Sequence, residues 1–106
     1  MIKRITVLLA VVLTARLGVV NYEGHRETFY NLNMEKICSR AAEKGIQGTY
    51  WEREDGAKMF GDYIIVATDW NLRPYGSIVE TSLGQGIVLD TGGFKNRNTV
   101  DIATTW

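Results

Sequence analysis

Short apolar runs separated by polar turns fill the second half of the chain. They have the length and the β-branched content of strands, and they cover residues 62–68, 76–82, 85–91 and 98–106. Residues 26–32 form an earlier run, in which Thr28, Phe29 and Tyr30 favour a half-buried strand. Strands of this length, spaced by about ten to fifteen residues, indicate a small β-barrel or sandwich rather than a parallel sheet of βαβ units.

One segment between these strands has a helical period instead. Residues 33–45 carry apolar side chains every three or four positions, as one face of an amphipathic helix does; these are Met34, Ile37, Cys38, Ala41 and Ala42. Asn33 can cap the start of this helix and Gly45 can end it. Cys38 lies on the apolar stripe and no histidine is placed to activate it, so we interpret its thiol as core packing. Residues 45–61, which follow, are polar and rich in turn residues.

The start of the chain differs from the rest. Lys3 and Arg4 precede an uncharged, mostly apolar run over residues 5–15, which is shorter than the span of about 20 residues that a bilayer requires. This order is typical of a secretory signal peptide, although a buried strand is the alternative because no Ala-x-Ala cleavage pattern ends the run. We therefore predict a signal peptide at residues 1–20 and a single exported domain at residues 21–106, extracellular or associated with the cell wall.

The composition narrows the functional classes. With 106 residues, the chain is long enough for one domain with one core. Its 12 basic and 12 acidic residues give no positive face for nucleic acid or an anionic membrane. The single Cys38 and the single His25 exclude an internal disulfide and the usual Cys/His zinc sites, and we expect no cofactor. The 11 glycines suggest many tight turns in a compact β-rich fold.

The stretch "GIVLDTGGF", residues 86–94, resembles the Asp-Thr-Gly loop of aspartic proteases. A retroviral-type protease subunit has this loop early in its chain, whereas only 16 residues follow Asp90 here. Bulky Phe94 also follows Gly93 in a region where such proteases usually have small residues, and a paired-carboxylate mechanism needs a second copy of the loop. A protease is therefore poorly supported. A purely structural alternative is that Asp90 caps a turn by accepting backbone hydrogen bonds.

Asp90 is one of three aspartates associated with successive apolar runs. Asp69 ends "YIIVATD", Asp90 ends "GIVLD", and Asp101 lies within "TVDIA", eleven residues after Asp90. With Pro74 and Gly76 in the turn after the first aspartate, the segments "VATDWNLRPYGS", "VLDTGGF" and "VDIA" resemble the 3D (three-aspartate) domain family. That domain occurs in the C-terminal part of membrane-bound lytic murein transglycosylase A and in stationary-phase survival proteins of spore-forming bacteria. The resemblance covers residues 64–103, and "TFYN" is similar to the family's opening strand.

The resemblance implies a fold and an activity. The expected fold is a small, mainly β, six-stranded double-psi β-barrel, with the short amphipathic helix near its start. The expected activity is that of a lytic transglycosylase, which cleaves the β-1,4 bond between N-acetylmuramic acid and N-acetylglucosamine of peptidoglycan. The muramyl 6-hydroxyl attacks its own anomeric carbon to give a 1,6-anhydro product, so one carboxyl must donate and later accept a proton. Burial or a neighbouring carboxylate would keep this carboxyl protonated near neutral pH.

The match to the family pattern identifies Asp101 as the expected acid/base. Asp90 and Asp69 would raise the pKa of Asp101, or anchor turns and sugar hydroxyls. Gly92 and Gly93 would let the backbone approach a sugar closely, because glycine has no Cβ.

Other side chains around these aspartates are candidates for contacts with the substrate. Trp70 stands where the family usually has proline, and with Tyr75 it flanks the turn after Asp69. Both rings are candidate sugar-stacking surfaces, with core packing as the equal alternative. Lys95, together with Arg97, could meet the acidic stem peptide of the glycan, although exposed loop charges usually meet only water. Two further aromatic side chains are assigned to packing: Trp51 and Trp106.

Two other functions remain open from the sequence. The domain could be a non-catalytic module that binds wall polysaccharide, since barrels of this kind also occur in such proteins. The three aspartates could instead hold Ca²⁺ or Mg²⁺, which prefer oxygen ligands, but their spacing is too long for a contiguous loop. The expected partners are peptidoglycan glycan strands, with no nucleic acid and no stable membrane span. The sequence does not determine the oligomeric state.

Overall fold

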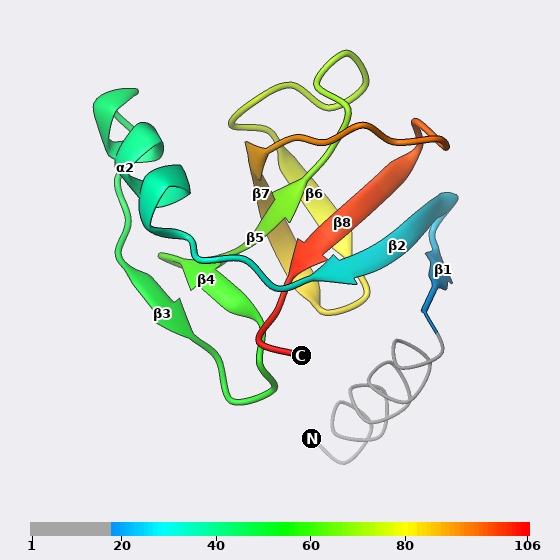
Figure 1. Cartoon of the computed structure of the whole chain (residues 1–106), viewed down its shortest axis with the longest axis horizontal. Helices are drawn as coiled ribbons and strands as arrows, with labels where there is room; N and C mark the ends of the chain where they lie inside the picture. Colours follow the sequence, from blue (N-terminus) through cyan, green and yellow to red (C-terminus); the bar gives the residue numbers. More distant parts are fainter. Residues whose placement is uncertain (1–17) are drawn as a thin grey trace.

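The computed structural model describes residues 18–106 as a mainly β fold with one short helix (Figure 1). The elements are β1 Val20–Tyr22, β2 His25–Tyr30, α2 Glu35–Glu43, β3 Tyr50–Glu52, β4 Lys58–Phe60, β5 Tyr63–Ala67, β6 Ile78–Thr81, β7 Gly84–Asp90 and β8 Thr99–Ala103. The predicted signal peptide lies, up to residue 17, outside the described residues. Within residues 18–106, no helix has the length and apolar character needed to cross a membrane.

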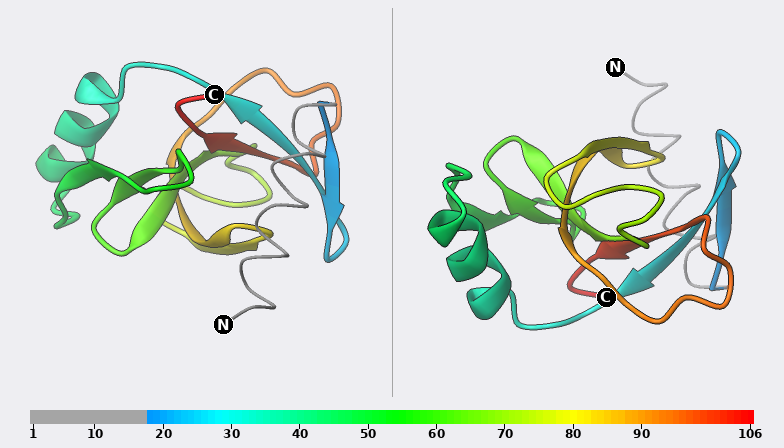
Figure 2. Two further views of the ribbon diagram at one scale, coloured as in Figure 1. Left: turned by 90° about the horizontal axis from the view of Figure 1, so that it is seen from below. Right: turned by 90° about the horizontal axis from the view of Figure 1, so that it is seen from above.

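The sheet is organised around β5. On one edge β5 pairs with β7 in parallel, and on the other it pairs antiparallel with β4 at its start and with β8 at its end. The sheet then extends from β8 to β2 and β1, from β4 to β3, and from β7 to β6. Figure 2 shows this strongly twisted arrangement from two further sides. The described strands number eight and the sheet does not close. The predicted mainly β fold with one short helix is thus confirmed. The predicted number of six strands is wrong, and the described strands do not form a closed barrel.

Two apolar clusters cover the two faces of the sheet. Because side chains alternate along a strand, neighbouring residues of β5 serve different clusters: Ile64 and Val66 pack with β7 and β8 residues on one face, and Ile65 packs on the other. The second face receives α2, whose Ile37 and Ala41 are buried against it. We call this second face the helix face of the sheet.

The predicted helix is confirmed with a small shift of its start. It begins at Glu35, and the Asn33 side chain accepts a hydrogen bond from the Glu35 backbone N–H at 2.9 Å. Gly45 follows the end of the helix with φ of 83°, a backbone conformation that favours glycine. Cys38 is half-buried on the side packed against the helix-face cluster, and its thiol is free. Its interpretation as packing agrees with this position.

Residues 45–61 contain two strands that the sequence pattern did not predict. All three residues of β4 are buried, Lys58 included. The Lys58 ammonium donates hydrogen bonds to Asn31 Oδ1 and to the Leu32 carbonyl, both at 2.6 Å. A lysine with two such acceptors can occupy a buried strand position, where a lone charge would be costly. These bonds tie β4 to the segment that leads from β2 into α2.

A buried polar cluster joins β2 to the turn between β6 and β7. The Glu27 side chain is 0% exposed. His25 Nε2 lies 2.7 Å from Glu27 Oε2, which also accepts the Ser82 backbone N–H at 3.0 Å. The Ser82 hydroxyl donates to the other carboxylate oxygen. Since a buried carboxylate is stable only with such partners, this cluster fixes β2 against the opposite side of the sheet.

Candidate active site

Two of the three predicted aspartates lie in one row across the centre of the sheet. In the strand pairing, Ala67 of β5 is opposite Asp90 of β7 on one side and opposite Asp101 of β8 on the other. Thr28 of β2 is paired with Asp101 and continues the row. Adjacent strands are about 4.8 Å apart, so the Cα atoms of Asp90 and Asp101 are separated by about two strand spacings. Their carboxylates therefore flank the small Ala67 side chain on the helix face.

A register shift in the sheet creates this row. Val66 pairs with Val88, but the next residue, Ala67, pairs with Asp90, so Leu89 has no counterpart in β5. Without this bulge, strict alternation would turn Asp90 to the opposite face. The bulge allows both Leu89, which is fully buried, and the half-buried Asp90 to contribute to the helix face.

The environment of Asp101 favours its protonated form. Burial raises the pKa of this carboxyl, and the negative charge of Asp90 raises it further. The Thr28 hydroxyl opposes the shift by donating a hydrogen bond to Asp101 Oδ1 at 2.8 Å. The net direction is upward from the ordinary value of an aspartate. A half-buried carboxyl of this kind can act as a proton donor.

Asp90 is held in place by one side chain and one backbone group. The Tyr30 hydroxyl donates to Asp90 Oδ2 at 3.0 Å, and the Thr91 backbone N–H donates to Asp90 Oδ1 at 2.8 Å. Burial and the charge of Asp90 raise the pKa of Tyr30, with a smaller contribution from Asp101. Tyr30 therefore remains a neutral hydrogen-bond donor, and it lies close enough to both aspartates for their charges to affect its pKa.

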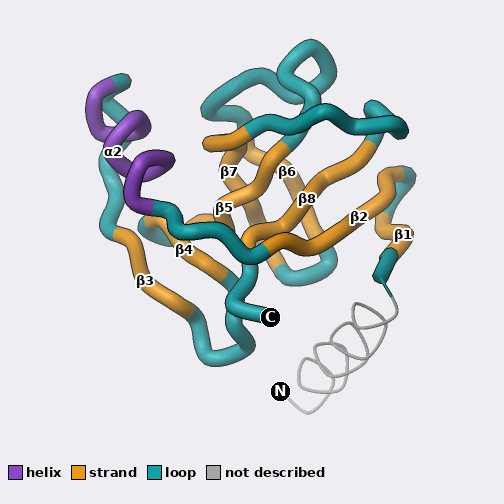
Figure 3. Tube along the Cα trace, in the orientation of Figure 1, coloured by secondary structure: helices purple, strands orange, loops and turns teal. Residues whose placement is uncertain are grey.

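Asp69 has a different position and a different partner. Its Oδ2 accepts a hydrogen bond from Arg97 Nε at 2.6 Å, and its Oδ1 accepts the Asn71 backbone N–H at 2.9 Å. The bond from Arg97 is the main reason why the pKa of Asp69 lies below its usual range. A second bond, from Arg73 to Asn98 at 2.7 Å, joins the same two loops, residues 68–77 and 91–98. These loops run beside each other where β5 and β7 end and β8 begins (Figure 3). Asp69 thus connects loops at the edge of the site, and of the two other aspartates only Asp90 contributes to the raised pKa of Asp101.

The predicted aromatic contacts lie next to Asp90. Trp70 is 37% exposed, and its indole N–H donates to the Asp90 backbone carbonyl at 2.9 Å. Its ring meets the edge of Tyr75 at a centroid distance of 5.5 Å. Tyr75 is more enclosed and packs against the helix-face cluster, with the Lys44 ammonium 5.4 Å from its ring centroid. Trp70 is consequently the ring with a surface available to a sugar, while Tyr75 supports it.

The glycines and cations predicted near the site lie in the exposed loop after Asp90. A Cβ on Gly93 would meet nothing within 4 Å, and one on Gly92 would make only ordinary contacts with Phe94. The fold itself therefore does not require glycine there, so any requirement would come from a ligand. Lys95 is exposed in this loop, whereas Arg97 is occupied by Asp69.

The two tryptophans assigned to packing differ. Trp106 lies 4.9 Å from the Phe29 ring and packs on the core. Trp51 of β3 is 45% exposed, although its indole N–H donates to the Gly61 carbonyl. The packing prediction is thus confirmed for Trp106 and wrong for Trp51.

A pocket with a volume of about 510 Å³ lies between Asp90 and the first half of α2. It is lined by Leu32, Asn33, Glu35, Lys36, Ile37, Arg40 and Asp90. We call it the helix pocket. Because Asp90 forms part of its wall, the helix pocket borders the Asp90 end of the row on the helix face.

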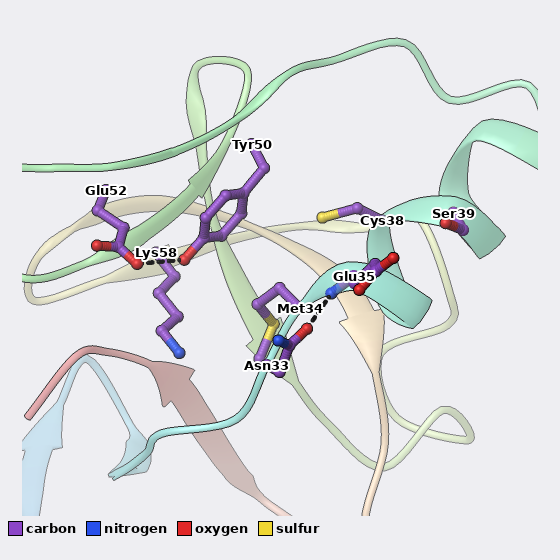
Figure 4. Close-up of a pocket in the computed structure, with 8 residues that line it drawn as sticks. All are labelled: Asn33, Met34, Glu35, Cys38, Ser39, Tyr50, Glu52 and Lys58. Atoms are coloured by element: carbon purple, nitrogen blue, oxygen red, sulfur yellow. Dashed lines mark hydrogen bonds between the residues drawn. The ribbon is translucent and has the colours of Figure 1, made fainter.

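A second pocket, of about 540 Å³, lies on the other side of α2 and contains none of the three aspartates. Figure 4 shows it between residues within or just before α2, such as Cys38 and Met34, and the strand residues Tyr50, Glu52 and Lys58. The Tyr50 hydroxyl donates to Glu52 at 2.8 Å, and burial and this bond raise the pKa of Tyr50 to about 12. Burial likewise raises the pKa of the Cys38 thiol. These groups are held in unreactive forms, so this pocket is a weaker candidate for chemistry.

The sequence interpretation missed Thr28 and Tyr30 as members of the site. Both lie on β2 two residues apart, so alternation places them on the same face of the sheet. Their polar tips reach Asp101 and Asp90 respectively. The sequence did contain a signal for both residues, because they place two hydroxyls on the same face of a strand that was predicted to be half-buried.

The described residues include no group of three or more His, Cys, Asp or Glu side chains that could hold a metal ion. Comparison of the chain with models of protein families, with curated proteins and with solved structures found no significant match.

Proposed function

We propose that this protein is a peptidoglycan lytic transglycosylase with Asp101 as its acid/base. The observation that carries the proposal is the pair of carboxyls flanking Ala67, in which burial and the charge of Asp90 raise the pKa of Asp101. The order and spacing of the three aspartates, which resemble the 3D domain, supply the substrate class.

In the proposed reaction, protonated Asp101 donates its proton to the glycosidic oxygen as the bond to the muramyl anomeric carbon breaks. The 6-hydroxyl of the same muramyl residue attacks that carbon. The Asp101 carboxylate then accepts the hydroxyl proton, which returns the residue to its starting state and gives a 1,6-anhydro product. No water enters the product, and no second carboxylate is needed as a nucleophile.

The neighbouring groups would prepare Asp101 for this role. Asp90 raises the pKa of Asp101 through its charge, and Tyr30 fixes the orientation of Asp90. Thr28 fixes the orientation of Asp101 through its hydrogen bond to Oδ1, which leaves Oδ2 available for proton transfer. Asp69 would act at a distance, by fastening the loops that border the site.

The proposal is tested by digesting purified murein and identifying the products by mass spectrometry. The unchanged protein should give anhydromuropeptides, and Asp101→Asn should reduce the rate by at least about 100-fold, as expected on losing a general acid/base. Asp62→Asn is the matched control, because Asp62 is exposed in the turn between β4 and β5. An Asp101→Asn protein as active as the control would contradict the assignment.

A non-catalytic wall-binding module is the second candidate. Trp70 favours it, because an exposed ring next to Asp90 suits sugar stacking whether or not the bond is cut. Binding of intact glycan strands without any anhydro product would support the module.

A further inference from the structure

The helix pocket is lined by two carboxylates, Glu35 and Asp90, and by two cations that pair with neither of them. Lys36 and Arg40 are one helical turn apart on α2, both are exposed, and both line the pocket beside Asp90. Neither forms an ion pair within residues 18–106. Arg40 also lies close to Tyr75, since its charge opposes the rise that burial causes in the pKa of that tyrosine.

Within residues 18–106, three other cations are engaged by acidic or carbonyl partners, whereas Lys95 is exposed and forms no ion pair. Arg97 is paired with Asp69, Arg53 with Asp55, and the buried Lys58 ammonium with two oxygen acceptors. Glu35, which also lines the helix pocket, and Glu43 border a depression on the outer side of the helix together with the same two cations. They do not form salt bridges with them. The pair therefore remains available to an anion that enters the helix pocket.

The pocket also has an apolar wall. Leu32, which is 49% exposed, and the buried Ile37 lie beside the two cations. An anion with small apolar groups would match this combination of surfaces better than a bare inorganic ion.

We propose that the helix pocket binds the carboxylates of the stem peptide attached to the muramyl residue being cleaved. This inference rests on the proposed function, because Asp101 would then hold the muramyl anomeric carbon at the row of aspartates. The peptide branches from that same sugar and would extend past Asp90 toward α2. Its alanine methyl groups would contact Leu32 and Ile37, and its carboxylates would pair with Lys36 and Arg40. The helix, rather than the loop that carries Arg97, would thus recognise the acidic part of the substrate.

The test compares two double variants on two substrates. Lys36→Gln with Arg40→Gln removes both charges, and Lys36→Arg with Arg40→Lys keeps them as the matched control. The substrates are glycan strands with their stem peptides and the same strands after an amidase has removed the peptides. For the charge-removing variant we expect KM to rise about three- to tenfold on peptide-bearing strands, with no change on stripped strands. The control variant should behave like the unchanged protein, and the effect should shrink at high salt.

Two outcomes would overturn the inference: an unchanged KM on peptide-bearing strands, or an equal loss on both substrates. Strands treated to remove phosphodiester-linked wall polymers form a third arm. If that treatment, rather than amidase treatment, abolishes the difference between variants, the anion is a phosphate and the inference is wrong.

A binding measurement separates this inference from the proposed function. In an Asp101→Asn background, retention on peptide-bearing and stripped strands should show the same dependence on Lys36 and Arg40. If the unchanged protein makes no anhydro product but binding still depends on the peptide and the two cations, only the proposed activity fails. If anhydro product forms and the charge-removing variant binds and reacts normally, only the peptide site fails.

Discussion

Replacing Thr28 with valine removes one hydrogen bond from Asp101 and leaves the shape of the side chain nearly unchanged. The Thr28 hydroxyl donates to Asp101 Oδ1 at 2.8 Å, and this bond stabilises the charged carboxylate. A hydrogen bond to a charged group contributes about 1.5 kcal/mol at the lower end of its range, which suits a half-buried site. That free energy corresponds to a shift of about one pKa unit. Thr28→Val should therefore raise the pKa of Asp101 by about one unit.

The assay is the pH dependence of anhydromuropeptide formation. Because Asp101 must be protonated to donate to the glycosidic oxygen, activity falls as the pH rises through its pKa. The alkaline limb of the profile should move up by about one pH unit in Thr28→Val. A valine side chain can neither accept nor donate a hydrogen bond, so Thr28→Ser, which keeps the hydroxyl, is the control and should keep the original limb. An alkaline limb that stays in place in Thr28→Val would refute the coupling between Thr28 and the reacting carboxyl.

Three further predictions concern stability and titration. Asp101 has a folded-state pKa above the unfolded value of about 3.9, so its contribution to stability is present below that value and is lost as the pH rises through the folded pKa. Asp101→Asn should therefore raise the melting temperature at neutral pH but not below about pH 3.9, and Asp62→Asn should change neither; a melting temperature that falls at neutral pH would contradict the raised pKa. Glu27→Ala leaves the buried histidine and serine partners of Glu27 without an acceptor and should lower the free energy of unfolding by about 3–5 kcal/mol, measured by urea denaturation; a loss below about 1 kcal/mol, the range of an exposed ion pair, would show that the cluster is not structural. Arg97→Gln should raise the pKa of Asp69 toward its ordinary range in a carboxyl NMR titration, and an unchanged titration would mean that Arg97 is not its partner in solution.

The elements that could be predicted from the sequence are those whose buried side chains form a recognisable pattern over four or more residues. The strands β2 and β5 to β8 contain β-branched or alternating apolar residues, and α2 has a stripe that repeats at helical spacing. The missed strands β1, β3 and β4 have three residues each, too few to show a period. Lys58 makes β4 still harder to predict, because a charged side chain is not expected in a buried strand. Its burial depends on hydrogen-bond acceptors about 26 residues earlier in the chain. The open sheet depends on β5 pairing with both β4 and β8 along one edge, which no local pattern encodes.

The three aspartates could be selected from the sequence, whereas their neighbours Thr28 and Tyr30 were missed and the geometry of the site could not be predicted. The spacing of the three aspartates drew attention to Asp69, Asp90 and Asp101. Their arrangement depends on the bulge that brings Asp90 level with Ala67, and a shift of one residue there would turn the side chain to the other face. Whether Arg97 meets a substrate or Asp69 depends in turn on how two distant loops approach each other.

The most direct test of the central claim is to digest murein with the unchanged protein in heavy-oxygen water and to analyse the new sugar ends by mass spectrometry. An intramolecular attack by the muramyl 6-hydroxyl adds no water. We therefore predict anhydromuramyl ends that are one water lighter than ordinary reducing ends and carry no heavy oxygen. Reducing ends labelled with heavy oxygen would show that the protein is a hydrolase and would contradict the central claim, and the absence of any new ends would show that it lacks the proposed activity.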